Sequence, residues 1–92
     1  MSLSLPCVLM YSKAICPFCI QAERLLRLRE VTEIEKIAVD LEPWRLSEMM
    51  EKTGRRTVPQ IFIGRTYVGG YDDLVALDRN GELQKLLKGE LS

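Results

Sequence analysis

Two cysteines separated by two residues are the part of this chain best suited to chemistry. They are Cys16 and Cys19, in the segment AICPFCIQ at residues 14–21. A pair at this spacing can bind a metal ion, form a structural disulfide or act as a redox couple. Each use requires different surroundings, and the rest of the sequence separates the three.

A structural metal site and a structural disulfide both fit poorly. Structural zinc takes four nitrogen or sulfur ligands, whereas this chain has one close cysteine pair, one further cysteine (Cys7) and no histidine. We expect Cys7 to be buried in a core strand, away from the pair. A disulfide that closes so small a loop removes little entropy from the unfolded chain. No metal-ligating residue is therefore predicted.

Redox chemistry suits the position of the pair. Pro17 favours the first position of a helix, where no N–H donor is needed, so Cys16 should cap that helix. Free N–H groups and the helix dipole stabilise a thiolate there, and the thiolate is the form that attacks disulfides. Lys13 adds a positive charge nearby. Cys19, one helical turn further on, should be more buried yet within reach of the first sulfur. We therefore predict that Cys16 attacks and Cys19 resolves.

Alternating strands and helices must hold this pair in place. The strand–helix–strand unit that contains it should be a right-handed parallel crossover, and the last two strands should form an antiparallel hairpin. The predicted fold class is therefore α/β, a four-stranded mixed sheet with helices on both faces. The first strand should be central, since it is nearly all apolar. Apolar periodicity and the Pro and Gly positions predict strands at 7–12, 34–39, 60–64 and 66–70, and helices at 17–30, at 43–54, from 72 or 73 and from 82.

The composition indicates one small domain, residues 1–92. Acidic and basic residues balance at 13 each, so we expect neither a nucleic-acid partner nor a membrane partner. No apolar run approaches the ~20 residues that span a bilayer. The start of the chain lacks the basic residues and cleavage site of a signal peptide. These features predict a cytoplasmic protein.

Three segments together resemble the dithiol glutaredoxins. YSKAICPFC at 11–19 resembles their active-site segment, which usually reads C-P-Y-C. RTVPQIFIG at 56–64 resembles their T-V-P segment, and GGYDDL at 69–74 resembles their G-G-x-D-D segment. The order and spacing match, and the resemblance extends over essentially the whole chain.

The resemblance implies a thioredoxin-like fold and a glutathione-dependent oxidoreductase. Cys16 would take glutathione from a glutathionylated protein, and a second glutathione would release it as oxidised glutathione. Cys19 would resolve the intermediate formed with protein disulfides. The implied partners are glutathione and glutathionylated or disulfide-containing proteins, and the chain is expected to be a monomer.

The resemblance also implies a glutathione-binding surface. The Val58–Pro59 bond is expected to be cis, so that the Val58 backbone pairs with the cysteine moiety of glutathione like a short added strand. Free N–H groups at the helix start near Gly70 should bind the γ-glutamyl carboxylate, and Asp72 should pair with the α-amino group beside it. The predicted glutathione-binding residues are Lys13, Phe18, Arg45, Thr57, Val58, Pro59, Gly70, Tyr71 and Asp72.

Some of these residues also have an ordinary structural explanation. Lys13 and Arg45 are assigned to the glycine carboxylate of glutathione, yet either could be a solvated surface charge. Asp72 could be an acid of the first helical turn, which is the capping role expected of Asp73.

Two residues depart from the usual family pattern. Tyr71 stands where a small residue is usual, so its ring could narrow or cover the site. Phe18 stands where Tyr is common. Phe18 is also shared with C-G-F-S relatives that bridge a [2Fe–2S] cluster between two subunits, which makes a glutathione-ligated cluster carrier the alternative function. Pro17 and Cys19 argue against that alternative, because C-G-F-S lacks both.

Overall fold

The computed structural model describes residues 6–89. The predicted order of strands and helices is confirmed. Residues 1–5, part of the segment predicted not to be a signal peptide, lie outside the described residues. Within residues 6–89, no helix is both long enough and apolar enough to cross a membrane. The elements are β1 (Val8–Ser12), α1 (Pro17–Leu28), β2 (Ile34–Ala38), α2 (Pro43–Thr53), β3 (Gln60–Ile63), β4 (Thr66–Gly69), α3 (Tyr71–Arg79) and α4 (Glu82–Leu87).

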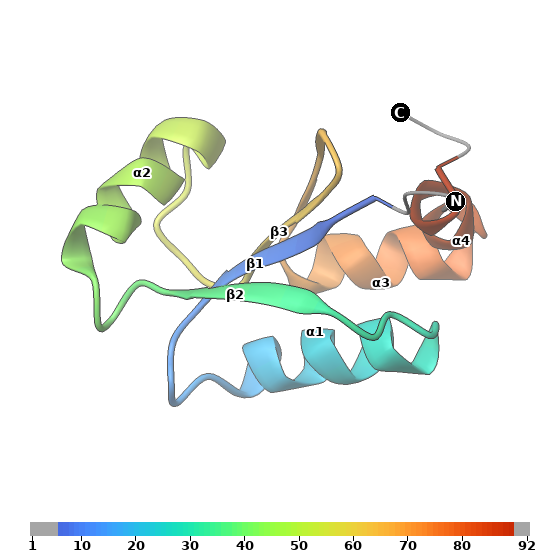
Figure 1. The fold of residues 1–92 in the computed structure, drawn as a ribbon, viewed down its shortest axis with the longest axis horizontal. Helices are drawn as coiled ribbons and strands as arrows, with labels where there is room; N and C mark the ends of the chain where they lie inside the picture. The colour runs from blue at the N-terminus through green and yellow to red at the C-terminus, as the bar shows by residue number, and fades with distance from the viewer. Residues whose placement is uncertain (1–5, 90–92) are drawn as a thin grey trace.

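The four strands form one mixed sheet in the order β2-β1-β3-β4 (Figure 1). β1 pairs in parallel with β2 and antiparallel with β3, and β3 and β4 form the predicted antiparallel hairpin. Gly64 begins the hairpin turn at φ 60°, a left-handed conformation that glycine adopts without strain. As predicted, β1 lies inside the sheet, and its Met10 and Tyr11 are almost completely buried. The predicted mixed sheet is therefore confirmed.

Helices cover both faces of the sheet and divide the core into two clusters. On one face, Leu26 of α1, Leu74 of α3 and side chains of α4 pack against β1 and β3. On the other face, Met49 of α2 packs against Tyr11 and Ile37. Figure 1 shows α2 separated from α1 by the sheet. Because neighbouring side chains of a strand point to opposite faces, β1 contributes to both clusters and is held firmly as it leads into the cysteine segment.

Cys7 corrects one expectation. It precedes β1 and is exposed, not buried. Its carbonyl oxygen accepts the Gly64 N–H at 2.7 Å, so its backbone prolongs the pairing between the strands. The residue itself lines a surface hollow, together with Leu28 and Leu87. The buried part of the apolar run begins one residue later, at Val8. Cys7 is a free thiol at the opposite end of β1 from the cysteine pair.

Candidate active site

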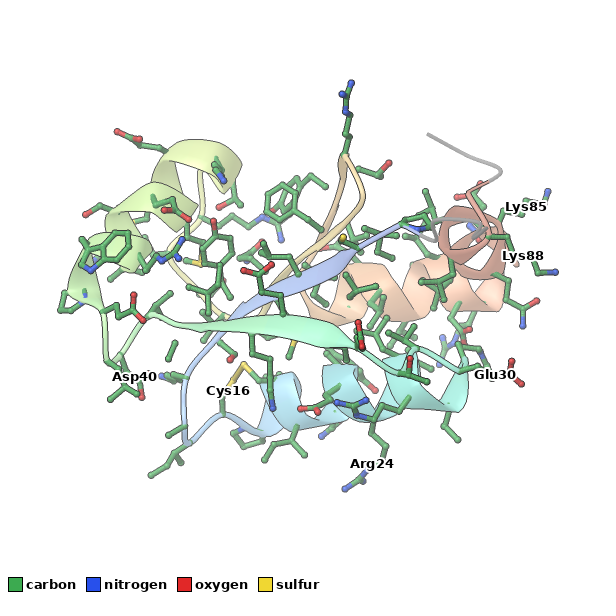
Figure 2. All side chains as sticks on the ribbon, viewed as in Figure 1. Cys16, Arg24, Glu30, Asp40, Lys85 and Lys88 are labelled. Carbon is green, nitrogen blue, oxygen red and sulfur yellow. A yellow bond between two sulfur atoms is a disulfide. The ribbon has the colours of Figure 1, made fainter. Side chains whose placement is uncertain are left out.

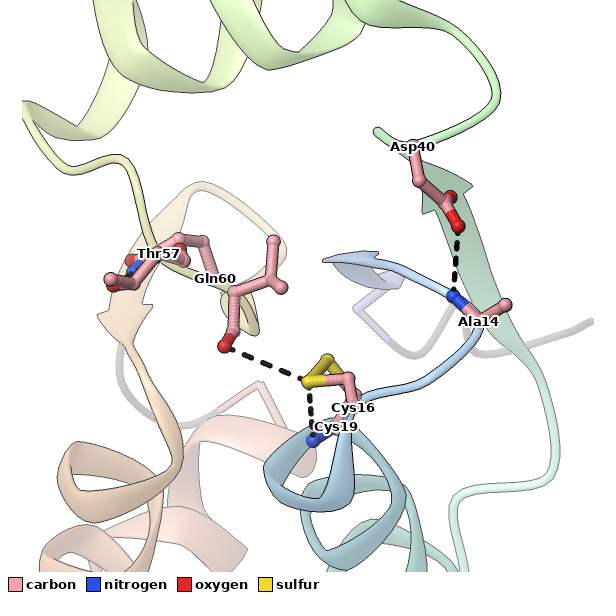
Figure 3. The surroundings of a disulfide bond; sticks show 7 residues. Ala14, Cys16, Cys19, Asp40, Thr57 and Gln60 are labelled. Atoms are coloured by element: carbon pink, nitrogen blue, oxygen red, sulfur yellow. Dashed lines mark hydrogen bonds between the residues drawn. A yellow bond between two sulfur atoms is a disulfide. The ribbon is translucent and has the colours of Figure 1, made fainter.

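Cys16 and Cys19 form a disulfide at the start of α1 (Figure 3). Cys16 is the N-cap residue, with extended backbone (φ −153°), and Pro17 occupies the first helical position, as predicted. The Cys16 Sγ atom accepts the Cys19 N–H at 3.2 Å. A sulfur at this position can therefore receive a helix N–H group directly, an arrangement that favours a thiolate after reduction.

The expected difference in burial between the two cysteines is absent. Cys16 is 5% exposed and Cys19 is 4% exposed. The bond explains this, because two joined sulfur atoms share one environment. Within the described part of the chain, no three His, Cys, Asp or Glu side chains gather in a way that could hold a metal ion.

The segment that ends at Pro59 lies against the disulfide. The Val58–Pro59 bond is cis, as predicted. The Cys16 Sγ atom lies 3.8 Å from the Val58 carbonyl oxygen (Figure 3). Gln60 is buried, and its side-chain amide donates to the Thr57 carbonyl oxygen at 3.0 Å. The Gln60 side chain thus stabilises the segment before Pro59, and the backbone of Val58 lies beside the reactive sulfur.

The start of α3 differs in one respect from the prediction. The Gly70 N–H is not free, because Asp73 Oδ2 accepts it at 2.9 Å. This is the capping role predicted for Asp73, and the same oxygen lies 3.1 Å from Arg55 Nη1. The physical reason is that an acid at the third helical position reaches back to the N-cap N–H. Among the described residues, nothing accepts the N–H groups of Tyr71 and Asp72, so these two can still bind an anion.

Phe18 and Tyr71 form a stacked aromatic pair. Their ring centroids are 6.0 Å apart, and the ring planes differ by 25°. Phe18 is 57% exposed, whereas Tyr71 is half-buried and packs against the larger core cluster. The Tyr71 ring therefore joins α3 to the first turn of α1, where the cysteines are.

The two predicted cations differ in their surroundings. Lys13 is exposed, and within residues 6–89 no acidic group lies within ion-pair distance of it. Arg45 Nη1 donates to both carboxylate oxygens of Glu48, at 3.0 and 3.1 Å. Its Nε lies 3.5 Å from Glu42 Oε1, and its guanidinium covers the Trp44 ring. Lys13 is therefore free to meet a ligand, whereas Arg45 is already held by protein groups.

Arg45 belongs to a network that reaches the core. Tyr11 is fully buried, and its hydroxyl donates to Glu48 Oε2 at 2.5 Å. This bond is the main cause that holds the pKa of Glu48 below its usual range, with Arg45 adding to it. Burial, followed by the bond to Glu48, raises the pKa of Tyr11 to about 12. The network ties α2 to β1.

Tyr11→Phe is expected to lower the free energy of unfolding by about 1 kcal/mol near neutral pH, because Glu48 loses a buried donor. The native state holds the Tyr11 proton more tightly than the unfolded state, whose pKa is near 10.0. The stabilisation by the protonated Tyr11 hydroxyl is therefore complete below pH 10.0, and it is lost as the pH rises toward about 12. Urea unfolding at neutral pH and above pH 10.0 measures it. A deficit of the variant that stays constant as the pH rises would show that Tyr11 does not titrate as described.

Three charged residues near the site were not among the predicted ones. They are Asp40, whose Oδ2 accepts the Ala14 N–H at 3.1 Å (Figure 3), Glu48 and Arg55. Each contact joins residues at least 18 positions apart, so no local pattern reveals it. For Asp40 a signal did exist, since it follows a strand predicted to end at the same sheet edge as the cysteine segment.

Comparison with known proteins agrees with this geometry. The profile of the family described as Glutaredoxin matches residues 8–68. A glutaredoxin of Pseudomonas aeruginosa is 48% identical over 83 residues, which are 90% of this chain and 98% of that protein.

Solved structures resemble the whole fold. The solution structure of a glutaredoxin from Brucella melitensis superposes with a TM-score of 0.80 at 44% identity, covering 97% of each chain. A crystal structure of a buckwheat glutaredoxin–glutathione complex superposes with a TM-score of 0.83 at 27% identity, covering 95% of this chain and 83% of that one. These likenesses confirm the thioredoxin-like fold that the sequence segments implied.

Proposed function

Because this chain belongs to the glutaredoxin family of glutathione-dependent disulfide oxidoreductases, we propose that it reduces glutathione mixed disulfides and protein disulfides through its Cys-Pro-Phe-Cys segment. The position of Cys16 carries the proposal. Cys16 caps α1 with its sulfur on a helix N–H, is bonded to Cys19, and borders the backbone of Val58.

The first half-reaction is a thiol–disulfide exchange. The Cys16 thiolate attacks the glutathione sulfur of a protein–glutathione mixed disulfide. A new bond forms between Cys16 Sγ and that sulfur, the old bond breaks, and the protein sulfur leaves as a thiolate that takes a proton from water. The helix N–H that stabilises the Cys16 thiolate here also stabilises it in the second half-reaction, where this thiolate is the leaving group.

The second half-reaction restores the enzyme. The thiolate of a free glutathione attacks the sulfur of the glutathione held on Cys16, the bond to Cys16 Sγ breaks, and Cys16 leaves as a thiolate. Oxidised glutathione is released, and the two electrons that reduced the protein have come from glutathione. With a protein disulfide, Cys16 instead forms a mixed disulfide with the protein, and Cys19 attacks Cys16 to release the reduced protein. That release would leave Cys16 and Cys19 joined as the disulfide described above, and two glutathiones would reduce it and leave together as oxidised glutathione.

The surroundings of the disulfide support a binding mode for glutathione. A peptide lying along the Val58 backbone, like a short extra strand, would place its cysteine sulfur beside Cys16, because the two protein groups are 3.8 Å apart. Thr57 and Pro59 flank this backbone. The unpaired N–H groups of Tyr71 and Asp72 suit the γ-glutamyl carboxylate, and the exposed Asp72 side chain suits the α-amino group.

The other predicted contacts follow from charge and shape. We assign the glycine carboxylate of glutathione to Lys13, since Arg45 is held by Glu42 and Glu48. Gly70 acts through Asp73, which occupies its N–H and shapes the start of α3. The stacked rings of Phe18 and Tyr71 would form an apolar wall of the site.

The reaction indicates where the chain works and with what. It consumes reduced glutathione, which reducing compartments supply, and this supports the cytoplasm as the location. The partners are glutathione and glutathionylated or disulfide-containing proteins, and the reaction needs only one copy of residues 1–92.

The test is turnover of a small glutathione mixed disulfide by the reduced protein, with glutathione, glutathione reductase and NADPH. We expect NADPH consumption that is proportional to protein concentration and that stops when glutathione is omitted. The variant Cys7→Ser is the matched control, since it removes a thiol at the far end of β1 and should be as active as the wild type. Absence of turnover by the reduced wild type would refute the proposal and direct the next experiment to anaerobic reconstitution of the alternative [2Fe–2S] cluster.

A further inference from the structure

The segment that leads into Cys16 is held by a carboxylate that the reaction does not use. Residues 13–15 belong to no helix or strand, and all three are exposed, Ile15 to 86%. Asp40 Oδ2 accepts the N–H of Ala14, in the middle of this segment, at 3.1 Å (Figure 3). Of the side chains that the structure describes, Asp40 is the one that hydrogen-bonds the backbone of residues 13–15.

The sheet explains why Asp40 reaches this segment. β1 and β2 are parallel, and Ser12 lies beside Ala38 at the ends of the two strands. The Val39 N–H donates to the Ser12 carbonyl oxygen at 2.9 Å, which prolongs the pairing by one residue. Asp40 is the next residue, so it leaves the sheet alongside the cysteine segment. Figure 2 shows Asp40 and Cys16 at the same edge of the sheet.

We propose that Asp40 is a positioning residue for the nucleophile, which rests on the proposed function of Cys16. The attacking sulfur must meet the sulfur of a glutathione held by the Val58 backbone on the other side. On its C-terminal side, Cys16 is held to α1 by the hydrogen bond that its Sγ atom accepts from the Cys19 N–H. On its N-terminal side, Asp40 holds the backbone at Ala14. The two hydrogen bonds together determine where the sulfur points. Reactions of this kind lose rate steeply when the reacting atoms are misplaced.

Asp40 could act on Cys16 through its hydrogen bond to Ala14 or through its negative charge, and the sign of the charge distinguishes the two effects. A negative charge near Cys16 disfavours a thiolate, so the carboxylate cannot help the attack through its charge. Any benefit must come from the hydrogen bond to Ala14. Asp40→Asn keeps a side-chain oxygen as acceptor and removes the charge, whereas Asp40→Ala removes both. A comparison of the two variants therefore isolates the hydrogen bond.

The test uses a chain in which Cys16 is the sole thiol, carrying Cys7→Ser and Cys19→Ser. In this background, Asp40→Ala is expected to slow the reaction of Cys16 with a small glutathione mixed disulfide roughly 10- to 100-fold. Asp40→Asn should restore the rate. Iodoacetamide needs no glutathione site, so its reaction with Cys16 should differ much less between the Ala and Asn variants. Glu33→Ala, an equal charge change at the other end of β2, should match the parent.

A second measurement tests the role of Asp40 independently of the proposed reaction with glutathione. The Ala14 amide should exchange with solvent faster in Asp40→Ala than in Asp40→Asn, while thermal unfolding of the two variants stays alike. Equal amide exchange in the two variants, or a mixed-disulfide rate that Asn does not restore, overturns the role of Asp40. A parent chain that reacts with iodoacetamide but not with the mixed disulfide refutes the proposed function instead, and the amide exchange then decides on Asp40 alone.

Discussion

Cys16→Ser is expected to reduce turnover of a glutathione mixed disulfide by on the order of 10³-fold or more, because a serine hydroxyl cannot replace the attacking thiolate. Every step of the proposed reaction forms or breaks a bond at the Cys16 sulfur. The helix N–H that contacts this sulfur at 3.2 Å stabilises an anion, and serine remains almost fully neutral at physiological pH. The measurement is the initial rate of NADPH consumption in the coupled glutathione reductase assay.

The fold should survive this substitution, since serine is itself a good N-cap residue. Circular dichroism and thermal unfolding of reduced wild type and variant check that point. A folded Cys16→Ser variant with activity near that of the wild type would assign the nucleophile elsewhere. Cys7 would then be the residue to test, because it is the free and exposed thiol among the described residues.

Cys19→Ser is expected to separate the two activities. Reduction of a protein disulfide should fall by on the order of 10²-fold, because release of the protein by an adjacent thiol is replaced by attack from dissolved glutathione. Turnover of a glutathione mixed disulfide should persist, since glutathione performs both halves of that reaction. The measurement compares a small protein disulfide and a glutathione mixed disulfide as substrates of the same preparation.

The trapped intermediate provides an independent readout. With a protein disulfide and no glutathione, the Cys19→Ser variant should accumulate a covalent complex with its substrate, visible by mass spectrometry and reversed by reductant. The paired variant Cys16→Ser should not accumulate it. Equal loss of both activities in Cys19→Ser would contradict the assigned roles and would indicate that Cys19 is needed to keep Cys16 reactive.

Much of the fold follows from local patterns in the sequence. Pro17 and Pro43 begin their helices because a first-turn position needs no N–H donor. Gly54 ends α2 at φ 73°, a conformation that favours glycine. The N-cap position of Cys16 follows from the same rules, as does the capping by Asp73. Each of these features depends on residues within one or two helical turns, so the sequence predicts them directly.

The cis bond before Pro59 has a different origin. Composition and spacing alone allow a trans bond there, and the prediction came from the resemblance of the RTVPQIFIG segment to glutaredoxins. The structure confirms it. The resemblance thus predicted the cis isomer, which the residues around Pro59 do not determine by themselves.

By itself, the sequence determined the order of strands and helices, the central strand and the cysteine pair at a helix start, since these depend on short-range periodicity and capping. Only the tertiary structure decided that Cys7 is exposed, that Arg45 is held by two carboxylates and that Asp40 supports the segment before Cys16. Exposure and side-chain partners depend on which distant segments meet at a sheet edge. The register of β1 against β2 and the packing of α2 determine which distant residues come into contact, and no short stretch of sequence carries that information.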